Sequence, residues 1–135
     1  MTTCLLKSRG IGDLLCLGGG GNDTLQIENG TVDIDAGEGN DLINVNGGSQ
    51  HTLAGGLGSD TVYIDGHVQW LEAGNGDDVV FAGENGSWYL LQLGHGDDVF
   101  FGGNDNDFVM AMRGTTLSSG ALVMMLWTVV KVTTP

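Results

Sequence analysis

The chain has 135 residues, of which 25 are glycine and one is proline, and this composition argues against an ordinary globular core. Seventeen acidic residues against four basic ones give a net charge of −13, which argues against binding to nucleic acid or to an anionic membrane. The longest apolar run, residues 121–130, is about half of what a bilayer requires, so no transmembrane segment is expected.

The first 13 residues form a flank that is expected to be irregular. They contain no apolar stretch long enough for a signal peptide, so export would have to use another route. The acidic residues are concentrated in the next part of the chain: sixteen lie between Asn22 and Asp107, where there is no Lys or Arg. A compact segment with this charge must bind cations or stay unfolded.

Residues 14–111 contain a glycine-rich motif that recurs and ends each time in an aspartate. Six copies lie at 18–23, 36–41, 55–60, 73–78, 93–98 and 102–107. Successive aspartates are 18, 19, 18, 20 and finally 9 residues apart, so the unit is nine residues and alternate copies have lost the aspartate. In those altered copies the aspartate position is taken by Val32, His51, Gln69 and Tyr89.

Short strands are predicted after each glycine turn, because apolar and polar residues alternate there. Strands this short cannot form a sheet alone, but stacked turns pair each strand with its equivalent in the next coil. Two nonapeptides then make one coil around a narrow apolar core. The predicted fold is therefore an all-β solenoid of about five coils.

Residues 18–26 (GGGGNDTLQ) and 55–63 (GGLGSDTVY) fit the pattern G-G-x-G-x-D-x-U-x throughout. Residues 36–44 and 73–81 replace only the first glycine with alanine, and residues 93–101 replace it with leucine. The segment thus resembles the RTX, or haemolysin-type calcium-binding, repeat family. This resemblance implies a right-handed parallel β-roll with calcium between successive turns on one side.

The resemblance also implies that aspartate side chains and turn carbonyls hold the calcium. Mapped onto this chain, about four sites are expected, and their ligands are Asp23, Asp41, Asp60, Asp78 and Asp98 with the turn residues Asn22, Asn40, Ser59, Asp77 and Asp97. Asp107 falls on the opposite side, without a partner turn. Oxygen ligands of this kind suit calcium better than zinc or copper.

Electrostatics supports a metal independently of the resemblance. Equivalent carboxylates in stacked turns lie about 5 Å apart, and each neighbouring pair repels by roughly 1 kcal/mol in water and more at lower dielectric. A row of five is therefore marginal without a cation, which predicts folding driven by calcium.

Other candidate functional residues fit a binding role poorly. His51, His67 and His95 never recur at one position of the repeat, so they are expected to be surface residues and not ligands. Trp70 and Trp88 fall at outward or turn positions, where a sugar contact is an alternative. No nucleophile or metalloprotease motif is present, and repetition explains acid pairs such as Asp77 and Asp78, so no enzyme is predicted.

Residues 112–135 break the pattern, with no aspartate and two basic residues. Met and Trp each have a single codon, and reading one base earlier gives an aspartate codon across Met124-Met125 and across Trp127-Thr128. We therefore hypothesise that this atypical tail results from a frameshift near residues 110–114.

The sequence predicts a calcium-stabilised RTX-like segment. The resemblance suggests a secreted, extracellular protein of toxin, protease, lipase or adhesin type, exported by a type I system. Two alternatives remain: a structural or adhesive solenoid that binds a polysaccharide or cell surface, and a non-catalytic module of a larger enzyme.

Overall fold

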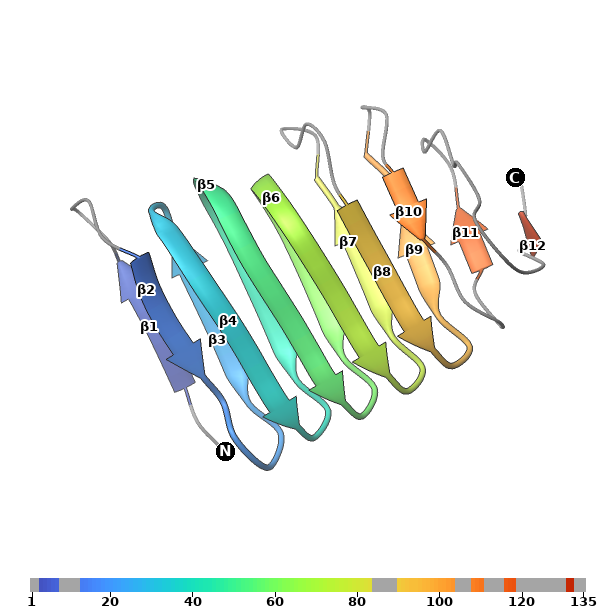
Figure 1. Cartoon of the computed structure of the whole chain (residues 1–135), viewed down its shortest axis with the longest axis horizontal. Coiled ribbons are helices and arrows are strands. Elements are labelled where there is room, and N and C mark those ends of the chain that lie inside the picture. The colour runs from blue at the N-terminus through green and yellow to red at the C-terminus, as the bar shows by residue number, and fades with distance from the viewer. Residues whose placement is uncertain are drawn as a thin grey trace.

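The computed structural model describes residues 3–7, 13–83, 90–103, 108–110, 116–118 and 131–132. These residues form a parallel β-solenoid of about four turns, close to the five coils expected, and contain no helix (Figure 1). Accordingly, no helix in the described part is long and apolar enough to cross a membrane. Trp88, Tyr89 and Asp107 lie outside the described residues, as does most of the tail, so the frameshift hypothesis stays a prediction.

Twelve strands make up the sheet in the described part of the chain, and they pair with one another in parallel. Their bounds are β1 Thr3–Lys7, β2 Asp13–Leu17, β3 Thr24–Glu28, β4 Thr31–Glu38, β5 Leu42–Leu57, β6 Thr61–Asn75, β7 Val79–Ala82, β8 Leu90–His95, β9 Val99–Phe101, β10 Phe108–Met110, β11 Thr116–Ser118 and β12 Lys131–Val132.

The strands lie in two layers that face each other across the core (Figure 1). One layer follows the order β1-β3-β5-β6-β7-β9-β11-β12, and the other pairs β2, β4, β5, β6, β8 and β10. The long strands β5 and β6 contribute to both layers, because each continues around the edge opposite to the glycine turns.

Each layer contributes more than one row of apolar side chains to the core, and the longest row of each layer contains five residues. Alternation places every second residue inward, as the burial pattern of β3 shows. Equivalent residues of successive coils are in register and at most 3% exposed: Leu25, Ile43, Val62, Val80 and Phe100 in one row, and Cys16, Ile34, Leu53, Leu71 and Leu91 in the other. The narrow apolar core predicted for the stacked coils is therefore confirmed.

The pairing of β5 with β6 is irregular on the side away from the aspartates. His51 pairs with Val68 and Thr52 pairs with Trp70, so Gln69 is an extra residue in β6. The prediction that Gln69 takes the aspartate position is wrong, because Val68 occupies that inward place and Gln69 is exposed. Burying the apolar residue in preference to the amide explains this bulge.

The flank 1–13, expected to be irregular, contributes a strand to the solenoid. Thr3–Lys7 pairs with β3 along its whole length, from Thr3 opposite Thr24 to Lys7 opposite Glu28. The sequence of this strand, TCLLK, consists mainly of residues that tolerate an extended backbone. It can therefore continue the parallel pairing of the solenoid. Within the predicted tail, β11 and β12 likewise extend the sheet beyond β9.

Candidate metal centre along one edge of the solenoid

Five glycine turns line up along one edge of the solenoid. They connect β2 to β3, β4 to β5, β5 to β6, β6 to β7 and β8 to β9 (Figure 1). In each turn the second and fourth residues are glycines with positive φ, for example 100° at Gly37 and 135° at Gly39. A Cβ on Gly37 would collide with the carbonyl oxygen of Gly19 in the preceding coil, so the stacking itself requires glycine.

The repeat aspartates turn inward and connect each coil to the next. Asp23, Asp41, Asp60, Asp78 and Asp98 are all buried, with at most 3% of their surface exposed. We call the four hydrogen bonds between them the inner ladder. In it the amide N–H of each aspartate donates to Oδ1 of the aspartate in the following coil, at 2.7 Å for Asp23 to Asp41, 2.8 Å for Asp41 to Asp60, 2.8 Å for Asp60 to Asp78 and 3.0 Å for Asp78 to Asp98.

In three of the five aspartates the second carboxylate oxygen lacks a protein partner. Oδ2 of Asp41, of Asp60 and of Asp78 is buried and accepts no hydrogen bond. A buried charged oxygen without a partner is strongly unfavourable. These atoms therefore mark the place where a cation would be most stabilising.

Burial of these carboxylates changes their acidity. The pKa of Asp60 is raised to about 6 and that of Asp78 to about 7. Desolvation is the main cause, the inner-ladder hydrogen bond opposes it, and the charges of neighbouring aspartates add to it. The pKa of Asp41 is raised for the same reasons. Without a cation, the folded edge therefore holds protons that free aspartates would have lost.

The residues that precede the aspartates form a second row on the solvent side, which we call the outer ladder. Asn22, Asn40, Ser59, Asp77 and Asp97 are exposed. Their side chains accept backbone N–H groups of the following coil: Asn40 to Asn22 at 3.0 Å, Ser59 to Asn40 at 3.0 Å, Asp77 to Ser59 at 3.3 Å and Asp97 to Asp77 at 2.9 Å. The two ladders run in opposite directions and together fix the spacing of the turns.

Residues 69–85 and 90–115 match the family model of the RTX calcium-binding nonapeptide repeat, in four copies. Residues 69–115 carry RTX repeats. The copies at 18–23, 36–41 and 55–60 lie before this match and form the same stacked turns with the same inner ladder. No curated protein and no solved structure matches the chain.

The RTX turns of this chain fit a cation that prefers oxygen. Next to Gly18 lie Oδ2 of Asp23 and the carbonyl oxygen of Ala36 in the following coil, and next to Gly55 lie Oδ2 of Asp60 and the carbonyl oxygen of Ala73. A Cβ on either glycine would fall 2.9 Å from Oδ2 of Asp23 or 2.6 Å from Oδ2 of Asp60. The missing Cβ thus leaves open a cradle that contains both a carboxylate and a carbonyl oxygen.

Backbone carbonyls are needed for such a site. In the described residues no three His, Cys, Asp or Glu side chains cluster closely enough to hold a metal alone. Carboxylates supplemented by carbonyl oxygens are the ligand set that calcium accepts in its flexible coordination. The outer-ladder residues were predicted to contribute their carbonyls, and the structure places them at the rim of the same turns.

The histidines differ from the expectation that all three lie at the surface. His51 is fully buried in β5, His67 is half-buried and His95 is exposed. Nε2 of His51 lies 3.1 Å from the carbonyl oxygen of Gly47, its Nδ1 has no partner, and burial lowers the pKa of the ring. The signal was present in the sequence, because His51 occupies the aspartate position of an altered RTX copy, which faces the core.

Proposed function

We propose that this chain is a calcium-dependent folding module that binds calcium between successive RTX turns. The observation that carries the proposal is the row of buried carboxylates whose Oδ2 atoms have no protein partner at Asp41, Asp60 and Asp78. About four ions are expected, one for each gap along Asp23, Asp41, Asp60, Asp78 and Asp98. When bound, calcium supplies the positive charge that this edge lacks.

The residues of the chain prepare this edge for the ion. The inner ladder fixes Oδ1 of Asp41, Asp60 and Asp78, whose Oδ2 atoms are buried without a protein partner. The outer ladder holds the turn backbones at the same spacing. Ionised and without calcium, the aspartates repel one another in a poorly solvated place, and the net stability of a domain is small enough for this to decide folding.

Circular dichroism and calorimetry of the full chain test this proposal. We expect little β structure with a chelator, full β structure with millimolar calcium, and a much weaker response to magnesium, which requires stricter octahedral geometry. Equal β content with chelator and with calcium would contradict the proposal.

We infer further that the module works outside the cell, as part of a secreted protein of toxin, protease, lipase or adhesin type. Calcium sites of extracellular modules have dissociation constants on the order of 0.1–1 mM, so such sites fill only where calcium is abundant. A chain that folds on meeting this calcium could leave the cell unfolded, as type I export would require. A calcium dissociation constant far below this range would argue against the inference.

The chain itself is proposed to be non-catalytic. The acidic residues that could resemble a catalytic pair, Asp77 and Asp78, take part in the outer and inner ladders respectively. The chain could then serve as a module of a larger enzyme, and a catalytic domain encoded next to it in the same reading frame would support that role.

A second candidate function is adhesion to a polysaccharide or a cell surface. It is favoured by the outer face of β6, where the partly exposed Trp70 lies two residues before the exposed Glu72. Loss of glycan binding after replacement of Trp70 and Trp88, with calcium uptake unchanged, would support it.

A further inference from the structure

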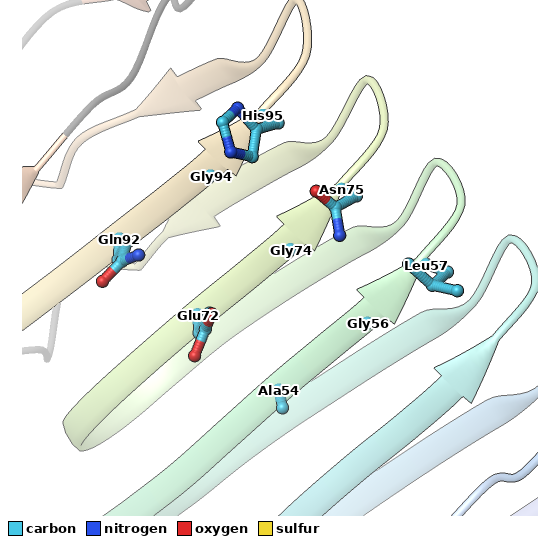
Figure 2. A pocket seen from close by; sticks show the side chains of 9 residues that line it. All are labelled: Ala54, Gly56, Leu57, Glu72, Gly74, Asn75, Gln92, Gly94 and His95. Carbon is cyan, nitrogen blue, oxygen red and sulfur yellow. The ribbon is translucent and has the colours of Figure 1, made fainter.

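A groove runs across three coils on the outer face of β5, β6 and β8, beside the calcium turns. Its volume is about 480 Å³. Figure 2 shows two rows of side chains with glycines between them. The floor consists of Gly56, Gly74 and Gly94; one wall consists of Ala54, Glu72 and Gln92, and the other of Leu57, Asn75 and His95.

The fold dictates the floor of the groove. Gly56, Gly74 and Gly94 have φ of 112°, 124° and 96°, and a Cβ on each would collide with the carbonyl oxygen of the glycine one coil earlier. The floor is therefore flat and apolar, made of Cα–H groups and backbone without side chains. A flat molecule can approach it closely along the solenoid axis.

The fold does not dictate the walls. Glu72, Asn75 and His95 are exposed and Gln92 is partly exposed, so none of them is needed in the core. Together they offer a carboxylate acceptor, two amides that both donate and accept, and an imidazole. The pairs Glu72 with Asn75 and Gln92 with His95 face each other across the floor in neighbouring coils (Figure 2).

We infer that this groove binds a linear, neutral polysaccharide of β-linked pyranoses, with its chain along the solenoid axis. An apolar floor between polar walls matches a pyranose whose ring faces carry C–H bonds and whose edges carry hydroxyl groups. The lining repeats once per coil, about 4.8 Å, close to the length that one such sugar adds to an extended chain. The inference rests on the calcium-loaded roll and adds the ligand class to its proposed adhesive function.

Charge and hydrogen bonding argue against two other extended polymers, a polyanion and a peptide. The sequence has no Lys or Arg between Asn22 and Asp107, while Glu72 lines the groove and Asp35 and Glu38 continue its two walls in the preceding coil. A polyanion is therefore repelled. An extended peptide would need free backbone groups, but the carbonyls of Asn75 and His95 already accept N–H groups from Gly58 and Gly76.

Calorimetric titration of the calcium-loaded full chain with cellohexaose tests the inference, with hexagalacturonate as the anionic comparison. Two double variants each remove one wall: Glu72→Ala with Gln92→Ala, and Asn75→Ala with His95→Ala. The matched control is Asn44→Ala on the outer face of the other layer, and calcium uptake is measured for every variant. We expect saturable cellohexaose binding that either wall variant weakens by about tenfold or more, and that the control leaves unchanged.

Three results would overturn the inference: no saturable binding of cellohexaose, equal binding by both wall variants and the unaltered chain, or equally tight binding of hexagalacturonate. Failure of the groove is distinguishable from failure of the calcium proposal. Calcium uptake without cellohexaose binding rejects the groove alone. Binding that depends on both walls but occurs without calcium uptake supports the groove and rejects the calcium module.

Discussion

At the scale of single residues, the buried carboxylates oppose folding until a cation is present. Asp60→Asn keeps a carbonyl oxygen that can accept the N–H of Asp41 but removes the charge. We expect Asp60→Asn to stabilise the calcium-free protein at pH 8 by about 1–2 kcal/mol, because a charged carboxylate no longer has to be buried. We also expect calcium to stabilise this variant less than it stabilises the unaltered chain. The β content in chelator, measured by circular dichroism, reports the first effect, and urea unfolding at increasing calcium concentrations reports the second.

The exposed acid Asp33 provides the control for this substitution, since Asp33→Asn removes the same charge from the outer face of β4. We expect it to change stability by less than about 0.5 kcal/mol. The interpretation of the buried row would be wrong if Asp60→Asn destabilised the calcium-free protein and left the calcium response intact.

The open cradle at Gly18 permits a matched pair of substitutions within one turn. In Gly18→Ala the new Cβ would meet the carbonyl oxygen of Ala36 and lie 2.9 Å from Oδ2 of Asp23, whereas a Cβ on Gly20 would meet nothing within 4 Å. We expect Gly18→Ala to cost about 1–3 kcal/mol and to weaken calcium binding in the first gap, with Gly20→Ala near neutral. Calcium titration of both variants checks this, and equal losses would contradict it.

The aspartate positions were predictable from the sequence, but the directions of their side chains were not. Spacing alone identified Asp23, Asp41, Asp60, Asp78 and Asp98 as equivalent. In the inner ladder, a carboxylate accepts the backbone N–H of the aspartate in the preceding coil. This arrangement depends on the stagger between coils, which no residue pattern encodes. His51 was misplaced for a different reason: histidine recurs at no position of the repeat, which suggested a surface residue, although the aspartate position that His51 occupies faces the core.

At the scale of strands, His51 is an imperfect substitute for an apolar residue. In the neighbouring coil its inward position is taken by Val68. We expect His51→Val to stabilise the protein by about 1 kcal/mol at neutral pH, because it removes a buried Nδ1 without a partner. Calcium uptake should not change, since β5 carries His51 on the side away from the aspartates.

Urea unfolding as a function of pH checks the role of His51 more specifically. Burial lowers the pKa of His51 in the folded protein. The buried neutral ring therefore contributes fully to the stability of the fold above about pH 6.5, and this contribution is lost as the pH falls. The advantage of His51→Val over the unaltered chain should therefore grow as the pH falls below 6.5. An advantage that shrinks there would show that His51 is not buried in its neutral form.

At the scale of the whole molecule, periodicity determined most of what could be predicted. The nine-residue unit located both rows of the core and the edge that carries the glycine turns. It failed where residues are inserted, at the bulge around Gln69, because several registers there satisfy the same spacing and packing of Val68 decides among them. The periodicity also predicted a solenoid that begins only at residue 14, whereas β1 already pairs with β3 although it contains no repeat motif.

The whole edge should respond to pH in opposite ways with and without calcium. Folded pKa values of about 6 for Asp60 and about 7 for Asp78 exceed the ordinary value of 3.8, so the calcium-free fold binds more protons than the unfolded chain. Its stability should therefore fall as the pH rises from about 4 to about 7, because the protons that relieve the buried charges are lost. Calcium competes with these protons for the same oxygens.

We thus expect calcium to stabilise the protein strongly at pH 8 and weakly at pH 5, and its binding near pH 6 to release protons. The β content by circular dichroism, with calcium and with chelator at the two pH values, measures the first effect, and calorimetry in buffers of different ionisation enthalpy measures the second. Asp60→Asn provides the control, because it removes one carboxylate that exchanges its proton for calcium. The number of protons released on calcium binding should therefore fall in this variant. Stabilisation by calcium that is equal at pH 5 and pH 8 would show that the buried aspartates are not where calcium binds.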